Sequence, residues 1–190
     1  MIDAAAPGHT PVLRPAVMAD RPALAALMER SVRGLSRDHY APGQIDGSLK
    51  TIFGIDGTLI ADGTYFVVTM GGAYAACGGW SRRRTLFGGD QAAGRSPDRL
   101  DPAIDAARIR AFFVDPAFAR RGIGRLLMRA SEQAARAEGF TWLELMATLP
   151  GVPLYTAMGF TATGRHEETL PGGDTIAFVP MRKRIGNATG

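Results

Sequence analysis

A short segment in the second half of the chain, VDPAFARRGIGRLLM from Val114 to Met128, constrains the fold more than any other. An apolar run of strand length, Ile109 to Val114, leads into it, and Asp115 and Pro116 end that run with turn chemistry. From Gly122 onward, apolar residues recur at helical spacing while arginines occupy the other face. The pattern predicts a buried strand, a glycine-containing turn and an amphipathic helix.

The sequence after this helix predicts a second strand. Gly139 is suited to stop the helix in a left-handed conformation, and Phe140 to Met146 is a further apolar run of strand length. A strand, a helix and a second strand in this order predict a right-handed crossover unit.

The start of the predicted helix is a candidate site for an anion. Backbone N–H groups lack partners there and the helix dipole is positive. Gly122 and Gly124 remove side chains that would keep a pyrophosphate from the backbone, and neighbouring arginines add positive charge. The alternative is an ordinary glycine turn with solvated arginines. The candidate phosphate-binding residues are Arg120, Arg121, Gly122, Ile123, Gly124 and Arg125.

Two other phosphate-binding motifs do not fit this segment. A Walker loop needs Lys and then Ser or Thr after its last glycine, whereas Arg125 and Leu126 follow Gly124. The dinucleotide fingerprint needs a small residue three positions after the second glycine, where Leu127 stands.

The segment resembles the signature of the GCN5-related N-acetyltransferase (GNAT) superfamily, a Gln/Arg-x-x-Gly-x-Gly/Ala loop between a strand and a helix. Gly122 and Gly124 match its two small positions, but Ala119 stands where the family has Gln or Arg. A second match is LYTAMGF, Leu154 to Phe160, which resembles the family's aromatic-Tyr-x-x-x-Gly-Phe segment. Leu154 replaces the aromatic residue.

The resemblance implies an enzyme, an N-acetyltransferase that uses acetyl-coenzyme A as co-substrate. The acetyl group would pass by direct attack to a primary amine of a small molecule or peptide. The implied fold is α/β of the α+β kind: a mixed, mostly antiparallel central sheet with a splayed parallel strand pair and flanking helices. In such a fold Phe112, Phe113 and Val114 would bind the coenzyme beside a bulge. The alternative is a non-catalytic acyl-coenzyme A-binding or sensor module on the same fold.

Tyr155 is the candidate catalytic residue. Pro150 and Pro153 are suited to start a short helix that Gly159 ends, which leaves the Tyr155 phenol able to donate a proton. In the family this tyrosine protonates the departing thiolate; simple packing of the ring against the sheet is the alternative.

The general base and the acceptor site are less clearly marked. The strand before Val114 offers no carboxylate, and Glu144 on the next strand could act as base or pair with an arginine. An acidic trio, Glu167, Glu168 and Asp174, could attract a cationic amine, although we favour a solvated loop.

Upstream, Val12 to Pro15 predicts a strand, and Asp20 is expected to cap a helix that ends near Arg33. Tyr65 to Met70 and Ala73 to Trp80 predict a β-hairpin. Downstream, Thr161 to His166 and Thr175 to Met181 predict a closing antiparallel pair.

The chain is expected to form a single domain over residues 11–185, between flexible termini at 1–10 and 186–190. Residues 81–107 lack periodicity and predict a long loop or a lid, with Arg82 to Arg84 in a solvated turn.

Composition bears on whether the chain binds nucleic acid, holds a metal ion or crosses a membrane. The formal charge of +4 raises a nucleic-acid-binding protein as an alternative, but the arginines are scattered and do not alternate with aromatic residues. Cys77 is the only cysteine, expected to be buried, and the three histidines are too dispersed to suggest a metal site. No targeting or membrane-spanning segment is evident, so a cytoplasmic monomer or homodimer without nucleic-acid or membrane partners is expected.

Overall fold

The structure, a computed structural model, describes residues 10–186. The termini expected to be flexible therefore lie mostly outside the described residues. One eight-stranded sheet has the order β1-β2-β3-β4-β5-β8-β6, with β7 also pairing with β8. The strands are β1 (Val12–Pro15), β2 (Tyr65–Met70), β3 (Ala73–Ser81), β4 (Ala107–Val114), β5 (Trp142–Thr148), β6 (Thr161–Ala162), β7 (His166–Thr169) and β8 (Thr175–Arg184).

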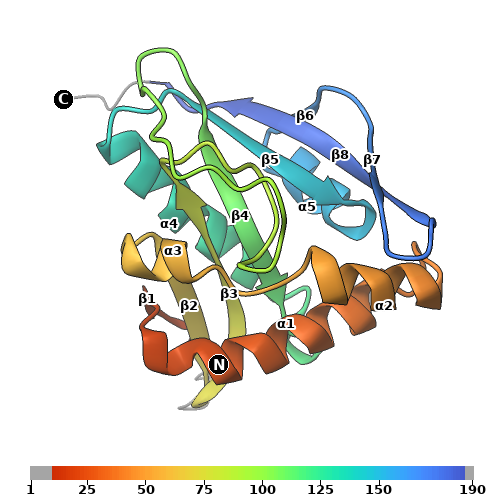
Figure 1. The fold of residues 1–190 in the computed structure, drawn as a ribbon. Coiled ribbons are helices and arrows are strands. Elements are labelled where there is room, and N and C mark those ends of the chain that lie inside the picture. The colour runs from red at the N-terminus through yellow and green to blue at the C-terminus, as the bar shows by residue number, and fades with distance from the viewer. Residues whose placement is uncertain (1–9, 187–190) are drawn as a thin grey trace.

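Helices cover both faces of this sheet (Figure 1). On one face lie α1 (Arg21–Ser36), α2 (Pro42–Thr51) and α3 (Gly57–Ala61), and on the other lie α4 (Ile123–Ala137) and α5 (Val152–Ala157). Within residues 10–186, no helix combines the length and the apolar character that a bilayer crossing needs.

The sheet is antiparallel except for β4 and β5, which are parallel. These two strands pair only at Ala107 with Leu143 and Arg108 with Glu144, and then diverge. The mixed sheet with a splayed parallel pair and flanking helices is thus confirmed.

A bulge interrupts β4 just beyond the paired residues. Its register with β3 shifts between Cys77 and Gly79, and Ala111 has a φ of 51°. A positive φ is unfavourable for alanine, so surrounding contacts must hold it. The hydroxyl of Tyr65 donates a hydrogen bond of 2.9 Å to the Ala111 carbonyl oxygen and supplies one such contact.

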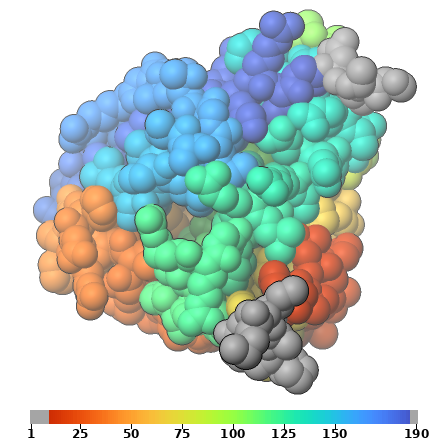
Figure 2. All heavy atoms as spheres, turned by 180° about the vertical axis from the view of Figure 1, so that it is seen from behind, coloured from red at the N-terminus to blue at the C-terminus, as the bar shows by residue number. Residues whose placement is uncertain are grey.

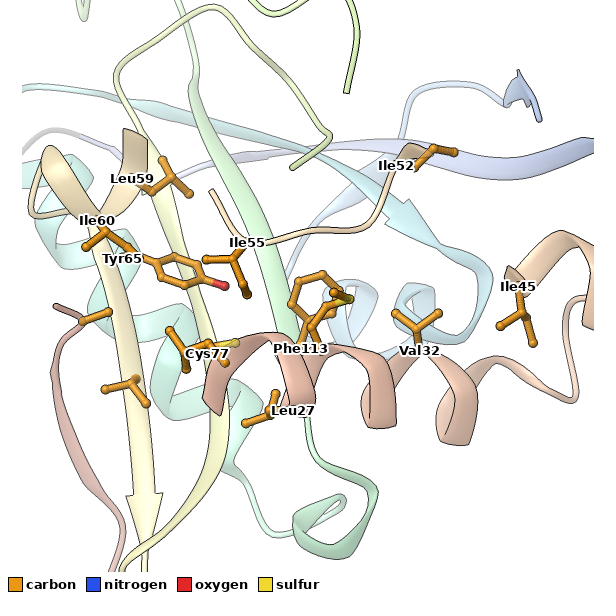
Figure 3. Close-up of a cluster of buried hydrophobic side chains, with 14 of the residues drawn as sticks. Leu27, Val32, Ile45, Ile52, Ile55, Leu59, Ile60, Tyr65, Cys77 and Phe113 are labelled. Atoms are coloured by element: carbon orange, nitrogen blue, oxygen red, sulfur yellow. The ribbon is translucent and has the colours of Figure 1, made fainter. Parts of the chain in front are cut away.

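The larger apolar cluster lies between α1 and the sheet (Figure 3). Cys77 from β3 and Phe113 from β4 point toward α1, which contributes Leu27 and Val32. Cys77 is buried, as expected for a thiol in an apolar strand. A second cluster, which includes Leu143 and Tyr155, fills the space under α4 and α5.

The connection between β3 and β4, residues 82–106, is a long irregular loop that packs back onto the domain (Figure 1). The expected solvated turn at its start is wrong: Arg82 pairs with Glu138 at 2.9 Å and Arg83 with Asp62 at 2.7 Å. These partners are distant in sequence, so local composition alone did not reveal them.

Two further sequence expectations need correction. Asp20 stands at the start of α1 but makes no side-chain cap; its carboxylate instead accepts hydrogen bonds from Arg14, Tyr74 and the Val17 N–H. The closing strand expected at residues 161–166 is divided into β6 and β7, and both pair with β8.

Candidate functional site

The loop before α4 has the geometry expected of an anion cradle. Arg120 and Gly122 have φ values of 65° and 79°, both in the left-handed region. Such alternation turns successive N–H groups toward one side, which forms an anion-binding concavity. Within residues 10–186, no hydrogen bond is donated by the backbone N–H groups of residues 120–125. These groups are therefore available to a ligand at the positive end of a helix of 15 residues.

The arginines of this loop differ in their surroundings. Arg120 and Arg125 are exposed, and neither has a carboxylate partner in the described part of the chain. The Arg121 guanidinium lies 5.7 Å from the centre of the Phe118 ring, a cation–π contact. The position expected to carry Gln or Arg, Ala119, forms the end of the short 3-10 turn instead.

The two motifs found in the sequence touch each other. A Cβ at Gly124 would lie 3.1 Å from a methyl group of Leu154 and 3.8 Å from one of Val114. Leu154 precedes Tyr155 on α5, so the start of α4 packs directly against the helix that carries the candidate catalytic tyrosine. Close packing therefore favours a glycine at position 124, beside any role in phosphate binding.

A cleft, called here the reaction cleft, opens where β4 and β5 diverge. Its walls include residues 109–113 of β4, Leu145 and Met146 of β5, and Phe178 of β8. Residues 52–54, which follow α2, and residues 86–89 of the 82–106 loop close it on the α1 face. Seen from the other side, the surface after β4 borders that of α5, and a hollow lies beside it (Figure 2).

Tyr155 lines this cleft from the opposite face of the sheet. Its side chain is buried, with an edge-to-face contact to Phe160 at 5.9 Å. Its hydroxyl has no hydrogen-bond partner among residues 10–186. Burial raises the pKa of Tyr155 well above its ordinary value. The phenol therefore stays protonated at neutral pH and can act as an acid.

The three strand residues expected to bind the coenzyme are arranged differently. Phe112 and Phe113 line the reaction cleft, but Val114 does not. The Phe113 ring also packs edge-on against Phe53 at 6.1 Å. The Val114 N–H donates to the hydroxyl of Ser31 at 3.2 Å, so this donor is already engaged.

The structure leaves few candidates for a general base near the cleft. Glu144 forms an ion pair with Arg108 between β4 and β5, the alternative that the sequence left open. On β7, the His166 ring lies 3.0 Å from a carboxylate oxygen of Glu168 and 5.6 Å from the Phe87 ring. Phe87 lines the cleft, which places this pair one side chain away from it.

Sequence reasoning missed a buried charge cluster beside the cleft. Arg110 of β4 is almost fully buried and pairs at 2.8 Å with Asp56, which is fully buried. Arg95 of the 82–106 loop also pairs with Asp56 at 2.8 Å, and Arg110 donates to the Gly88 carbonyl oxygen. Burial lowers the pKa of Arg110 to about 10, so it remains charged at neutral pH. The cluster fastens the loop over β4.

The signal for this cluster was weak. An arginine inside the apolar run of β4 was the only local hint, because its partner lies more than fifty residues earlier. No group of His, Cys, Asp and Glu side chains within the described range 10–186 is arranged to hold a metal ion.

Comparison with known proteins identifies the fold. Residues 101–185 match the family described as the acetyltransferase (GNAT) domain. No protein with a curated description matches the sequence significantly.

Solved structures of GNAT proteins match nearly the whole chain. A GCN5-related N-acetyltransferase from Rhodopseudomonas palustris is 21% identical with a TM-score of 0.69, over 94% of this chain and 98% of that one. PaiA N-acetyltransferase from Thermoplasma acidophilum, in complex with coenzyme A, is 11% identical with a TM-score of 0.62, over 92% and 99%.

Salmonella typhimurium yncA, solved with acetyl-coenzyme A, is 16% identical with a TM-score of 0.62, over 95% and 97%. The resemblance found in the sequence is confirmed: the chain has the GNAT fold, and its residues 101–185 match the GNAT acetyltransferase domain family.

Proposed function

We propose that this protein is an N-acetyltransferase that moves an acetyl group from acetyl-coenzyme A to a primary amine of a small molecule or peptide. The observation that carries the proposal is the environment of Tyr155. Its side chain is buried and protonated, and its hydroxyl has no partner among residues 10–186, in a cleft between diverging strands. The Tyr155 hydroxyl makes no structural hydrogen bond in the described residues and lies near the anion cradle. These two features favour a catalytic role over packing alone.

The residues present fit acetyl-coenzyme A. The unpaired N–H groups of residues 121–125 would bind the pyrophosphate, with Arg120 and Arg125 adding charge. The β4 residues Phe112 and Phe113 would line the path of the pantetheine arm into the reaction cleft. Two of the similar structures contain coenzyme A or acetyl-coenzyme A, which supports this assignment.

The proposed reaction is direct transfer. The neutral amine attacks the thioester carbonyl, a C–N bond forms, the C–S bond breaks, and the nitrogen loses its extra proton to water or a base. Tyr155 gives its proton to the leaving thiolate and regains one from solvent. Backbone N–H groups at the Ala111 bulge would stabilise negative charge on the carbonyl oxygen, an effect of about 3 kcal/mol for one preorganised donor.

Two measurements test the proposal. Acetyl-coenzyme A should raise the melting temperature of the protein, since a ligand of the folded state stabilises it by mass action. Tyr155→Phe should reduce kcat about 100-fold or more while leaving the affinity for acetyl-coenzyme A unchanged. No thermal shift with any coenzyme A compound would overturn the proposal.

The other functions predict different results. A non-catalytic acyl-coenzyme A-binding or sensor module would bind acetyl-coenzyme A but acetylate no amine in a broad panel. A nucleic-acid-binding protein would bind DNA or RNA with an affinity that falls steeply with salt, and would not respond to the coenzyme.

A further inference from the structure

A second cavity, called here the side cavity, adjoins the reaction cleft on the α1 face of the sheet. It lies between the end of α2, the 82–106 loop and the β7–β8 connection. Ile52, Leu86 and Phe87 line both the side cavity and the reaction cleft. A molecule with its reactive end in the cleft could therefore extend past these side chains into the side cavity.

The wall of the side cavity is held rigidly around Arg84. The Arg84 N–H donates to the Asp98 carbonyl oxygen at 2.9 Å. The next residue, Thr85, donates through its hydroxyl to the Ser96 carbonyl oxygen at 3.0 Å and accepts from the Ser96 N–H at 2.9 Å. These hydrogen bonds hold the backbone at and after Arg84, whose exposed side chain lies on the cavity wall.

The side cavity contains two charged residues, Arg84 and Glu168. Glu168 already has a hydrogen-bonding partner, the His166 ring, at 3.0 Å. In the same loop, Arg82, Arg83 and Arg95 all pair with carboxylates. Arg84 and Arg99 are the exceptions, with no carboxylate partner among residues 10–186, and of these two Arg84 is the one that lines the side cavity.

Because Glu168 has a partner and Arg84 has none in the described residues, the side cavity favours an anionic group on the molecule that fills it. The acidic trio considered from the sequence is largely engaged, because Arg165 pairs with Glu167 at 2.9 Å and His166 with Glu168. A guanidinium offers parallel N–H donors that match a carboxylate in geometry and charge. The apolar wall between the charge and the cleft suits a hydrocarbon spacer.

We propose that the side cavity is the acceptor-binding site and takes an amine that also bears a carboxylate, with Arg84 binding the carboxylate and the amine reaching the cleft past Phe87. The assignment rests on the proposed function, because it names the acceptor class of that reaction. The competing acceptors are a diamine, whose second ammonium group would pair with Glu168, and an alkylamine that has no second charged group.

Three compounds with the same six-carbon chain separate these acceptors: ε-aminocaproate, hexylamine and hexamethylenediamine. Their binding to the intact protein is measured by titration calorimetry without acetyl-coenzyme A, so the result does not depend on turnover. The wild type should bind ε-aminocaproate most tightly. Arg84→Gln should weaken that binding about fivefold or more and leave hexylamine unaffected.

Arg129→Gln is the matched control, because Arg129 is also exposed and lies on α4, behind the sheet. It should leave all three affinities unchanged. Equal binding of the three compounds, no binding of any, or an Arg84→Gln variant that binds ε-aminocaproate like wild type would overturn the proposal. A preference for the diamine that Glu168→Gln abolishes would assign a cationic acceptor instead.

Binding of acetyl-coenzyme A, measured on the same samples, keeps this result separate from the proposed function. If the protein binds acetyl-coenzyme A but Arg84→Gln does not change the affinity for ε-aminocaproate, the acceptor assignment is wrong and the proposed function stands. If the protein does not bind acetyl-coenzyme A, the proposed reaction is wrong, whatever the affinities for the three amines.

Discussion

At the scale of single residues, the buried phenol of Tyr155 sets the pH dependence of the proposed reaction. Burial raises the pKa of Tyr155 above its ordinary value of 10.0, so the proton stays on the hydroxyl in mildly alkaline solution. We expect kcat to rise with pH as the amine loses its proton, without a decline up to about pH 9.5. A descending limb below that pH that is missing from the residual activity of Tyr155→Phe would mean that Tyr155 loses its proton there, which would contradict the raised pKa.

Tyr40 offers a contrast between a structural and a catalytic hydroxyl. Its hydroxyl donates to the Ala177 carbonyl oxygen at 2.7 Å and accepts from the Leu149 N–H at 2.8 Å. Tyr40→Phe leaves both groups without this partner and should lower the free energy of unfolding by about 1–3 kcal/mol. Tyr155→Phe removes no hydrogen bond and should cost much less. Urea unfolding of the two variants measures the difference, and equal losses would mean that the Tyr155 hydroxyl also has a structural role.

At the scale of elements, the loop before α4 can be tested with a matched pair of glycines. Gly122 and Gly63 have φ values of 79° and 71°, and a Cβ at either would meet no atom within 4 Å. Alanine at each site should therefore cost a similar amount of stability, about 1 kcal/mol, from backbone strain alone. Only Gly122→Ala should also weaken acetyl-coenzyme A binding, measured by calorimetry. If both variants bind the coenzyme like wild type, the loop is not the phosphate site.

The 82–106 loop depends on the buried cluster of Asp56, Arg95 and Arg110. Arg110→Met leaves the Asp56 carboxylate buried with one cation fewer, which should destabilise the protein by about 3 kcal/mol. Combining it with Asp56→Asn should cost less than the sum of the two single variants, because the pair is coupled. Limited proteolysis should show faster cleavage within the loop in Arg110→Met. Additive losses and an unchanged cleavage rate would mean that the cluster does not hold the loop.

At the scale of the whole molecule, paired carboxylates control stability in acid. Hydrogen bonds from Arg14 hold the pKa of the Asp20 carboxyl far below its ordinary value of 3.8, and Arg83 lowers the pKa of Asp62. The unfolded chain therefore takes up these protons first as the pH falls. The stabilisation is complete above about pH 5 and declines through pH 4 toward the lower pKa values of the folded state.

Urea unfolding between pH 7 and about pH 3 measures this decline. Asp20→Asn should be less stable at pH 7 and should show a shallower loss in acid than the wild type. Asp38→Asn is the control, because Asp38 is exposed and pairs with no cation in the described residues. If Asp20→Asn loses stability in acid as steeply as the wild type, groups other than Asp20 control the acid sensitivity.

Periodic elements were predictable because their signals are local. The strand Val12–Pro15, the β2–β3 hairpin and the β4–α4–β5 unit follow from spacing, turn residues and glycine stops, and the structure has them within a few residues. The bulge at Ala111 was implied only by resemblance, since alanine there is held by a tyrosine from another strand. The packing of the 82–106 loop depends on ion pairs between residues far apart in sequence.

The candidate site shows the same division. Tyr155 and the glycine loop could be found because each lies in a short motif, and the order of the motifs matched a known pattern. The contact between Leu154 and Gly124, the pairing of Glu144 with Arg108 and the position of Arg84 on a cavity wall are consequences of tertiary packing. Residue spacing carries no information about such contacts.

The burial of Cys77 bears on how the reaction can be observed. Burial raises the pKa of this thiol to about 12, and it is the only sulfhydryl that the chain possesses. The native protein should consequently give almost no colour with Ellman's reagent and lose no activity in its presence. The free coenzyme A released by the reaction would then be the sole source of colour. A continuous spectrophotometric assay would therefore measure turnover without correction for thiols of the protein.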